Sequence, residues 1–357
     1  MSSSSSEKPM RQQVEEYIVS LQESIVSGFE KIDPNAPKFK RDSWIRAQGG
    51  RGQSCVFAMP DPSSPAGKAN THTSVLEKGG VNISIVHGLL PPAAIKQMRA
   101  DHSSIPFDPE KETSLPFFAA GLSLVIHPRN PNAPTVHANY RYFEITEPLK
   151  EGDTGQGKVM AWWFGGGCDL TPSYFFEEDA KHFHSVLKAG CDQHGADLYP
   201  AFKKWCDEYF YLPHRQEARG IGGIFFDDLS DEPHKHLPSG SSAPRPKTPS
   251  ELFAFIKTMG DSFGPSYFPI LTKRMSLPYD DHMRRWQLVR RGRYVEFNLV
   301  YDRGTKFGLM TPGARIESIL MSLPEVARWE YMTEMGSEEG TEEWKLIQVL
   351  KTPREWA

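Results

Sequence analysis

A row of polar residues in segment 136–144 is the strongest chemical signal in this sequence. The segment reads Val-His-Ala-Asn-Tyr-Arg-Tyr-Phe-Glu. If it forms a β-strand, the alternation of side chains puts His137, Asn139 and Arg141 on one face and the apolar and aromatic residues on the other. An imidazole beside a fixed cation suits a pocket for an anionic substrate that exchanges a proton. The alternative is an ordinary polar face of an exposed strand.

Two aspartates stand where strands are predicted to end. Residues 159–164 are apolar on both faces, which predicts a buried strand, and the glycines at 165–167 follow it before Asp169. Glycine lets a backbone approach a ligand closely, and a carboxylate at that position would be partly desolvated. Asp302 follows residues 293–301, whose strict alternation predicts another strand. The alternative is that each aspartate only caps a helix or starts a turn.

Arginines and histidines near these segments widen the set of candidates. Arg219 precedes a glycine-rich strand entrance, and Arg315 follows Pro-Gly-Ala at a predicted helix start. Each could clamp a carboxylate with two hydrogen bonds, or be an ordinary surface arginine. A histidine metal site is a further alternative, although no HxxxH or HExxH spacing supports it. Two aspartates, a histidine and several arginines together suit a ligand with several carboxylates and a basic or N–H-bearing centre.

The elements that must position these residues follow from periodicity. Helical spacing of apolar residues between Val14 and Phe29 predicts a helix packed on the core. Strands are predicted at 81–86, 122–127, 136–144, 159–164, 221–227 and 293–301, and helices from about 171, at 198–211, twice within 250–275, at 280–290 and at 315–323. Strands joined by short turns predict an α+β fold with a large, mainly antiparallel sheet covered by helices.

Length and composition set the outer limits. We expect residues 1–9 to be a disordered lead-in, 10–357 a single domain, and 230–250 an exposed loop insertion. With 41 basic and 45 acidic residues, the net charge of −4 disfavours nucleic acid or an anionic membrane as the main partner. The four cysteines form no CxxC pair, which favours a reducing compartment. Without a long apolar run, an apolar signal core or a transit-peptide pattern, we expect a cytoplasmic protein with no membrane span.

Several longer motifs resemble one enzyme family in order along the chain. They are Ser-Leu-Val-Ile-His-Pro from Ser123, the 136–144 segment, Trp-Trp-Phe-Gly-Gly-Gly-Cys-Asp-Leu-Thr-Pro from Trp162, Arg-Gly-Ile-Gly-Gly-Ile-Phe-Phe-Asp-Asp-Leu from Arg219, the segment from Arg290 to Thr305 and Glu-Ser-Ile-Leu-Met-Ser-Leu-Pro from Glu317. From about residue 10 to the C-terminus, the sequence is similar to oxygen-dependent coproporphyrinogen III oxidases.

The resemblance implies an activity and a general organisation. It implies oxidative decarboxylation of two propionates of the tetrapyrrole coproporphyrinogen III to vinyl groups, giving protoporphyrinogen IX, with O2 consumed and CO2 and hydrogen peroxide released. It also implies a sheet flanked by helices on both faces, no organic cofactor, and a homodimer to which region 293–315 contributes. Metal dependence is claimed for some members of the family, and a metal requirement is doubtful for this chain. The histidines that match the proposed metal ligands are His127, His137, His184 and His214.

The resemblance also assigns roles to single residues. His137 matches the family's proton donor, and Asp169 and Asp302 match carboxylates thought to engage pyrrole N–H groups, with Arg219 at the same site. The residues that match substrate contacts are Ser123, Asn139, Tyr140, Arg141 and the turn residues Gly313, Ala314 and Arg315. The 312–315 turn varies within the family. Two other functions stay open: a histidine-metal oxygenase or hydrolase, and a non-catalytic tetrapyrrole carrier.

Overall fold

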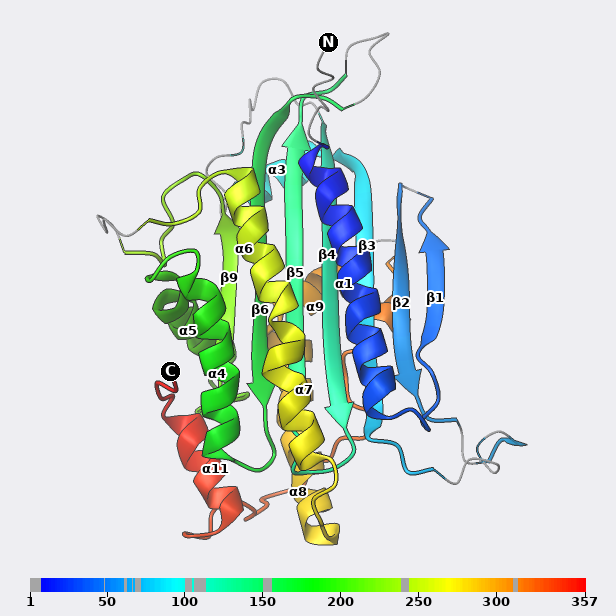
Figure 1. Cartoon of the computed structure of the whole chain (residues 1–357), viewed down its shortest axis with the longest axis vertical. Helices are drawn as coiled ribbons and strands as arrows, with labels where there is room; N and C mark the ends of the chain where they lie inside the picture. The colour runs from blue at the N-terminus through cyan, green and yellow to red at the C-terminus, as the bar shows by residue number, and fades with distance from the viewer. Residues whose placement is uncertain are drawn as a thin grey trace.

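A seven-stranded antiparallel sheet is the centre of the molecule (Figure 1). The computed structural model describes residues 8–47, 49–60, 63–65, 67, 72–99, 105, 114–149, 156–238, 244–310 and 314–357. In spatial order the strands are β1 (Lys40–Ile45), β2 (Gly50–Ala58), β3 (Leu76–Leu90), β4 (Leu115–Pro128), β5 (Thr135–Thr146), β6 (Val159–Thr171) and β9 (Gly223–Leu229). Strands β1 to β6 each pair with the next strand in the chain, and β6 pairs with β9 at the edge. The register of each pair shows which side chains are neighbours on a face.

Most predicted strands are confirmed, and one is longer than expected. The predictions at 81–86, 122–127, 136–144 and 221–227 fall in β3, β4, β5 and β9. Strand β6 does not end at Phe164 but continues through the three glycines to Thr171, because β5 and β9 pair with it on both sides. Asp169 therefore lies inside a strand, and the helix predicted from about 171 begins only at Glu177.

One face of the sheet is covered by helices that bury an ordinary apolar core. The helices on this face include α1 (Met10–Ile32), α4 (Glu177–Asp192), α6 (Pro249–Asp261) and α7 (Phe263–Arg274), which lie in front of the strands in Figure 1. The predicted stripe of α1 is confirmed, since Val14, Ile18, Leu21, Ile25 and Phe29 are all buried. Burial of these apolar side chains is the main contribution to the stability of this face.

The other face carries the elements that bound the candidate site. Helix α8 (Asp281–Glu296) continues into a π-helical turn, η1 (Phe297–Tyr301), followed by α9 (Arg303–Met310) and α10 (Ile316–Leu320); α8 and α9 lie behind the strands in Figure 1. The strand predicted at 293–301 is therefore wrong. From α8 into η1 the chain buries Trp286, Arg290 and Tyr294 at steps of four and then Phe297, which is a helical face. A short alternating pattern does not distinguish the two periods.

The remaining elements complete the layers. The hairpin of β7 (Tyr211–Leu212) and β8 (Glu217–Ala218) follows α5 (Leu198–Tyr209), while α3 (Pro92–Met98) and α11 (Glu342–Lys351) lie elsewhere on the chain. The predicted helices at 198–211, within 250–275, at 280–290 and at 315–323 are confirmed, with α10 shorter than expected. Of the predicted loop, the described residues 230–238 and 244–248 contain neither helix nor strand. The four cysteines are buried and unpaired.

Candidate active site

Strand register brings the predicted polar row together with a patch of glycines. On the face opposite α1, His137, Asn139 and Arg141 of β5 pair directly with Asp169, Gly167 and Gly165 of β6. Gly121 of β4 also pairs with Arg141, and Ser123 pairs with Asn139. We call Gly121, Gly165 and Gly167 the glycine floor, because these positions leave bare backbone between the polar side chains. A floor without side chains can accept a flat ligand at close range.

At one end of the floor, three side chains form a hydrogen-bonded chain into the interior. His137 Nδ1–H donates to Asp169 Oδ1 at 2.7 Å, and Arg219 Nη2 donates to Asp169 Oδ2 at 2.6 Å. Arg219 Nη1 also donates to Asn298 Oδ1 of the π-helical turn at 3.1 Å. The side chains of Asp169 and Arg219 are only 3% and 2% exposed, whereas that of His137 is 22% exposed. His137 is thus the member that can meet a ligand.

The charge of Asp169 orients the His137 ring within this chain. Burial by itself raises the pKa of Asp169, but the Arg219 charge and the hydrogen bonds from His137 and Arg219 outweigh it and lower the pKa below its usual value. An ionised Asp169 accepts a hydrogen bond from Nδ1, so Nε2 is the ring nitrogen that this chain leaves unengaged. In this arrangement Nε2 is the ring atom available for proton transfer.

Arg219 lies behind the site rather than in it. Its guanidinium carbon is 4.0 Å from the ring centre of Phe210, 4.5 Å from that of Tyr294 and 4.9 Å from that of Phe297. These aromatic faces partly replace the water that a buried guanidinium loses. Arg219 was expected at the same site as Asp169, and it is bonded directly to that residue. The Arg219 side chain has no open surface with which to hold a substrate carboxylate.

The other end of the floor carries a second Asp–Arg pair, which is open to solvent. Arg141 Nη2 lies 3.0 Å from Asp227 Oδ1, and Arg141 Nη1 donates to Asn139 Oδ1 at 2.7 Å. Both side chains are about one-third exposed. Asp227 was missed in the sequence, although an acid inside the mainly apolar strand 221–227 was a signal that could have identified it. Beyond this pair, Phe117, Phe143 and Trp163 stack across β4, β5 and β6 and form an apolar wall.

Asp302 lies near the buried end but on a different element from the predicted one. It follows the π-helical turn instead of ending a strand. Its Oδ1 accepts from Tyr209 Oη at 2.9 Å, and its Oδ2 accepts from the backbone N–H and the hydroxyl of Thr305 at 2.7 Å each. Asp302 therefore caps α9. This is a local structural role, as is the turn-starting role that was the plainer interpretation of its sequence.

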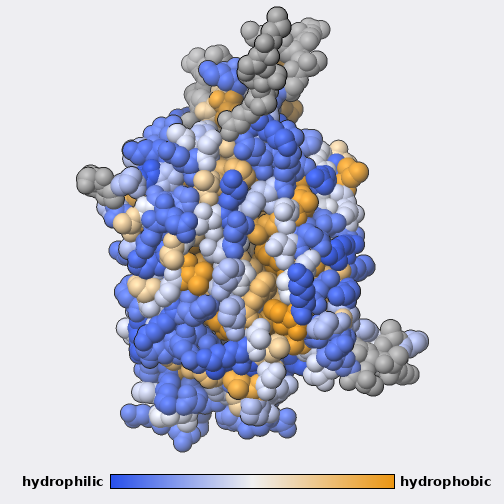
Figure 2. Space-filling view, in the orientation of Figure 1, coloured by the Kyte–Doolittle hydropathy of each residue, from blue (hydrophilic) through white to orange (hydrophobic). Residues whose placement is uncertain are grey.

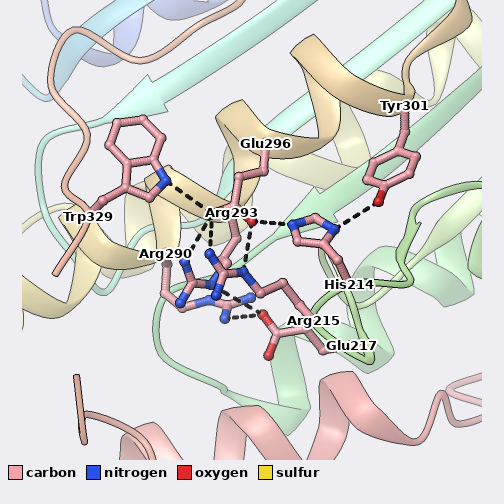
Figure 3. Close-up of polar contacts among 8 residues, drawn as sticks. All are labelled: His214, Arg215, Glu217, Arg290, Arg293, Glu296, Tyr301 and Trp329. Carbon is pink, nitrogen blue, oxygen red and sulfur yellow. Dashed lines mark hydrogen bonds and ion pairs between the residues drawn. The ribbon is translucent and has the colours of Figure 1, made fainter. Parts of the chain in front are cut away.

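A dense ion-pair cluster fixes the π-helical turn from the outside (Figure 3). The carboxylate of Glu296, the last residue of α8, accepts two hydrogen bonds from Arg215 and one each from His214, Arg293 and Trp329. Burial alone would raise the pKa of Glu296, but the hydrogen bonds from Arg215 and His214 lower it to about 2. Since His214 and Arg215 belong to the turn that leads to Arg219, this cluster joins that turn to the residues around Asn298.

The four candidate metal-binding histidines lie apart. His127 contacts the backbone oxygen of Ser322, His184 contacts Tyr199 and the backbone oxygen of Ile221, and His214 belongs to the Glu296 cluster. Burial lowers the pKa of His127 and that of His184 to about 3, so both are neutral. Among the described residues, no three His, Cys, Asp or Glu side chains come together in a possible metal site.

The remaining substrate-contact candidates separate into three groups. Ser123 lies on the site face. The Tyr140 side chain lies on the opposite face, fully buried, where its hydroxyl donates to the backbone oxygen of Met259. Arg315 pairs with Asp42 of β1, four strands from His137, or about 19 Å at the usual strand spacing. Ala314 precedes it, and Gly313 lies outside the described residues.

A large groove of the described surface lies away from this site. It has a volume of about 890 Å3 between α1, α6 and α7 and is lined mainly by apolar residues such as Leu21, Ile25 and Phe268. Figure 2 shows hydrophobic side chains along the middle of this helical face. The groove contains neither His137 nor its partners. The titratable groups described above converge on the opposite face of the sheet, which makes that face the candidate site.

Comparison with known proteins gives a consistent picture. Residues 13–356 match the coproporphyrinogen III oxidase family. A Drosophila melanogaster protein named oxygen-dependent coproporphyrinogen-III oxidase is 49% identical over 347 residues, which are 97% of this chain and 78% of the relative. A chloroplastic relative from Glycine max and a mitochondrial one from Homo sapiens, both of that name, are each 48% identical over 97% of this chain, and the match covers 80% and 67% of their lengths.

Proposed function

This chain belongs to the coproporphyrinogen III oxidase family, and we propose that the face of the sheet around His137 carries out the family's reaction. The reaction is the oxygen-dependent oxidative decarboxylation of two propionates of coproporphyrinogen III to vinyl groups, which gives protoporphyrinogen IX. The observation that supports the site is the chain from Arg219 through Asp169 to His137, which leaves Nε2 beside a glycine floor.

The proposed mechanism divides the work between proton transfer and positioning. Each propionate, taken as the carboxylate, loses CO2, one proton and two electrons to become a vinyl group. These two electrons, that proton and one further proton reduce O2 to hydrogen peroxide. His137 Nε2 moves a proton in this exchange, because Asp169 holds the other ring nitrogen protonated. Arg219 keeps Asp169 ionised. Arg141 is open enough to bind a propionate by a charge-assisted hydrogen bond.

Measurement of oxygen uptake together with CO2 release, on addition of coproporphyrinogen III, tests the function. The wild-type chain is expected to consume one O2 for each CO2 released. His137→Ala should reduce turnover about a thousandfold, the usual size of a general acid–base contribution. Substrate binding without oxygen uptake by the wild type would instead identify a tetrapyrrole carrier, and full turnover by His137→Ala would reject the role of Nε2.

The proposal includes catalysis without an organic cofactor and with O2 as co-substrate, and a requirement for metal is doubtful. It is supported by the separate contacts of His127, His137, His184 and His214, each of which already binds other protein groups. The test is metal analysis of chelator-treated protein alongside its turnover. Loss of activity that one added metal restores would favour the histidine-metal alternative.

Assembly and location remain proposals. None of the helices that the structure describes has both the length and the apolar character needed to cross a membrane. We propose a homodimer to which region 293–315 contributes, because this region exposes Leu299, Val300 and Met310. Light scattering of the wild type and of Met310→Asp tests the homodimer, and the variant is expected to be monomeric.

A cytoplasmic location is also proposed, and cell fractionation tests it. The names of several relatives include mitochondrial or chloroplastic.

A further inference from the structure

The substrate of the proposed reaction needs hydrogen-bond acceptors as well as cations. Its propionates require donors such as arginine, whereas its pyrrole N–H groups require an acceptor that faces the macrocycle. Asp169 and Asp302 were the expected acceptors. Both oxygens of Asp169 already accept from His137 and Arg219, and both oxygens of Asp302 accept from Tyr209 and Thr305. Every carboxylate oxygen of Asp169 and Asp302 therefore already has a donor from the protein.

Asp227 is an acid on the same face that retains free acceptor capacity. Its Oδ1 lies 3.0 Å from Arg141 Nη2, and its side chain is 33% exposed. Its Oδ2 has no hydrogen-bond partner within the part of the chain that the structure describes. The carboxylate lies over the floor, because a Cβ added to Gly165 would overlap Asp227 Oδ1 and would come within 2.7 Å of Arg141 Nε.

A distortion of strand β9 aims Asp227 in this direction. Phe164 pairs with Leu229 and Gly166 with Phe226, so the single residue Gly165 stands opposite both Asp227 and Asp228. Asp228 adopts a left-handed conformation with φ of 57°, which is uncommon for residues other than glycine, asparagine and aspartate. Such bulges redirect a side chain, and both bulges and strained backbone conformations are frequent next to active sites.

We propose that Asp227 is a catalytic residue of this site: its carboxylate binds pyrrole N–H groups of the macrocycle that lies on the glycine floor, while Arg141 beside it binds a propionate. An anionic acceptor there also stabilises the positive charge that develops on the pyrrole as electrons leave for O2. The inference rests on the proposed function and changes which acid performs this task, from Asp169 to Asp227.

The test compares Asp227→Ala with Asp228→Asn as a matched control from the same bulge. Asparagine tolerates the left-handed conformation, so the control removes the neighbouring charge and keeps the backbone. Asp227→Ala should weaken anaerobic binding of coproporphyrinogen III about tenfold to a hundredfold, the loss expected for a hydrogen bond to a charged group, and should lower kcat as well. Asp228→Asn should stay within about threefold of wild type on both measures.

A double-mutant cycle separates substrate contact from support of Arg141. If Asp227 touches the substrate, Asp227→Ala weakens binding in an Arg141→Met background about as much as in the wild type. If Asp227 only orients Arg141, its effect disappears in that background, and the proposal is overturned. Wild-type turnover, measured in the same series, separates a failure of this inference from a failure of the proposed function.

Discussion

Two Asp–Arg pairs stand at opposite ends of the glycine floor, and they differ in burial more than in geometry. Asp169–Arg219 has an N–O distance of 2.6 Å and is almost fully buried, whereas Asp227–Arg141 has one of 3.0 Å and is about one-third exposed. Taking two charges out of water is costly unless further partners satisfy them. The buried pair has those partners in His137, Asn298 and an aromatic cage. The open pair has water, which a ligand can replace.

This difference suggests a division of labour. A buried pair is fixed in one arrangement, so it can hold the His137 ring and its tautomer during turnover. An exposed pair gains little from its mutual attraction and therefore loses little when each partner turns to a substrate group. The same two residue types thus serve as a fixed support at one end and as a binding site at the other.

The comparison is broken most directly by removing each arginine in turn. Arg219→Met leaves the Asp169 charge buried without its partner, so we expect the free energy of unfolding to fall by about 3–5 kcal/mol. Arg141→Met should cost less than about 1 kcal/mol, because its pair is partly solvated. Urea denaturation of both variants measures this, and equal losses would contradict the division of labour.

Adjacent glycines separate the site face from the core face. Gly165→Ala places a methyl group against Asp227 and Arg141, and turnover should fall about a hundredfold with little change in stability. Gly166→Ala points to the other face, where its Cβ would lie 2.6 Å from the backbone oxygen of Asn139, so stability should fall by about 1–3 kcal/mol. Steady-state kinetics and thermal unfolding of the two variants give the answer. The opposite pattern would mean that the two faces are assigned wrongly.

The dependence of stability on pH tests whether the interior behind the buried pair requires His184 to be uncharged. Burial lowers the pKa of His184 to about 3, and its Nε2 lies 3.0 Å from the backbone oxygen of Ile221, two residues after Arg219. Since the unfolded histidine titrates near 6.5, the unfolded state binds more protons between about pH 6.5 and 3, and stability falls as the pH falls. We expect protonation of this residue to lower the free energy of unfolding by about 2 kcal/mol between pH 7 and pH 5. His184→Gln should remove that share, as measured by urea denaturation at both values; an unchanged slope would reject it.

The smallest expected effect concerns the outer cluster that supports the buried end. Glu296→Gln should lower kcat about tenfold with little change in KM, because it loosens the junction that carries Asn298 and Arg219. Glu330→Gln is the matched control, since Arg285 and Arg328 hold that carboxylate in the same way and likewise lower its pKa to about 2. The kcat of Glu330→Gln should equal that of wild type, and an equal loss in both variants would point to a general effect of lost ion pairs.

The sequence predicted the parts of this molecule that depend on local periodicity. The alternation in 136–144 and the stripe of α1 were each read correctly, because each residue's neighbours along the chain reveal which face is buried. The same reasoning failed at 293–301, where alternation over nine residues fits a strand but the buried side chains follow a helix. It also ended β6 too early, because glycines that look like a turn are retained when a strand pairs on each side.

The sequence by itself therefore determined a mainly antiparallel sheet, the polar face of β5 and, by resemblance, the family. Only the tertiary structure decided which charges are buried: it put Arg219 behind Asp169, Tyr140 on the core face, Arg315 at the far strand and Asp227 over the glycine floor. The physical reason is that the environment of a charge depends on partners distant in the chain. Strand register, a bulge and a caging set of aromatic rings bring those partners together, and no local pattern encodes them.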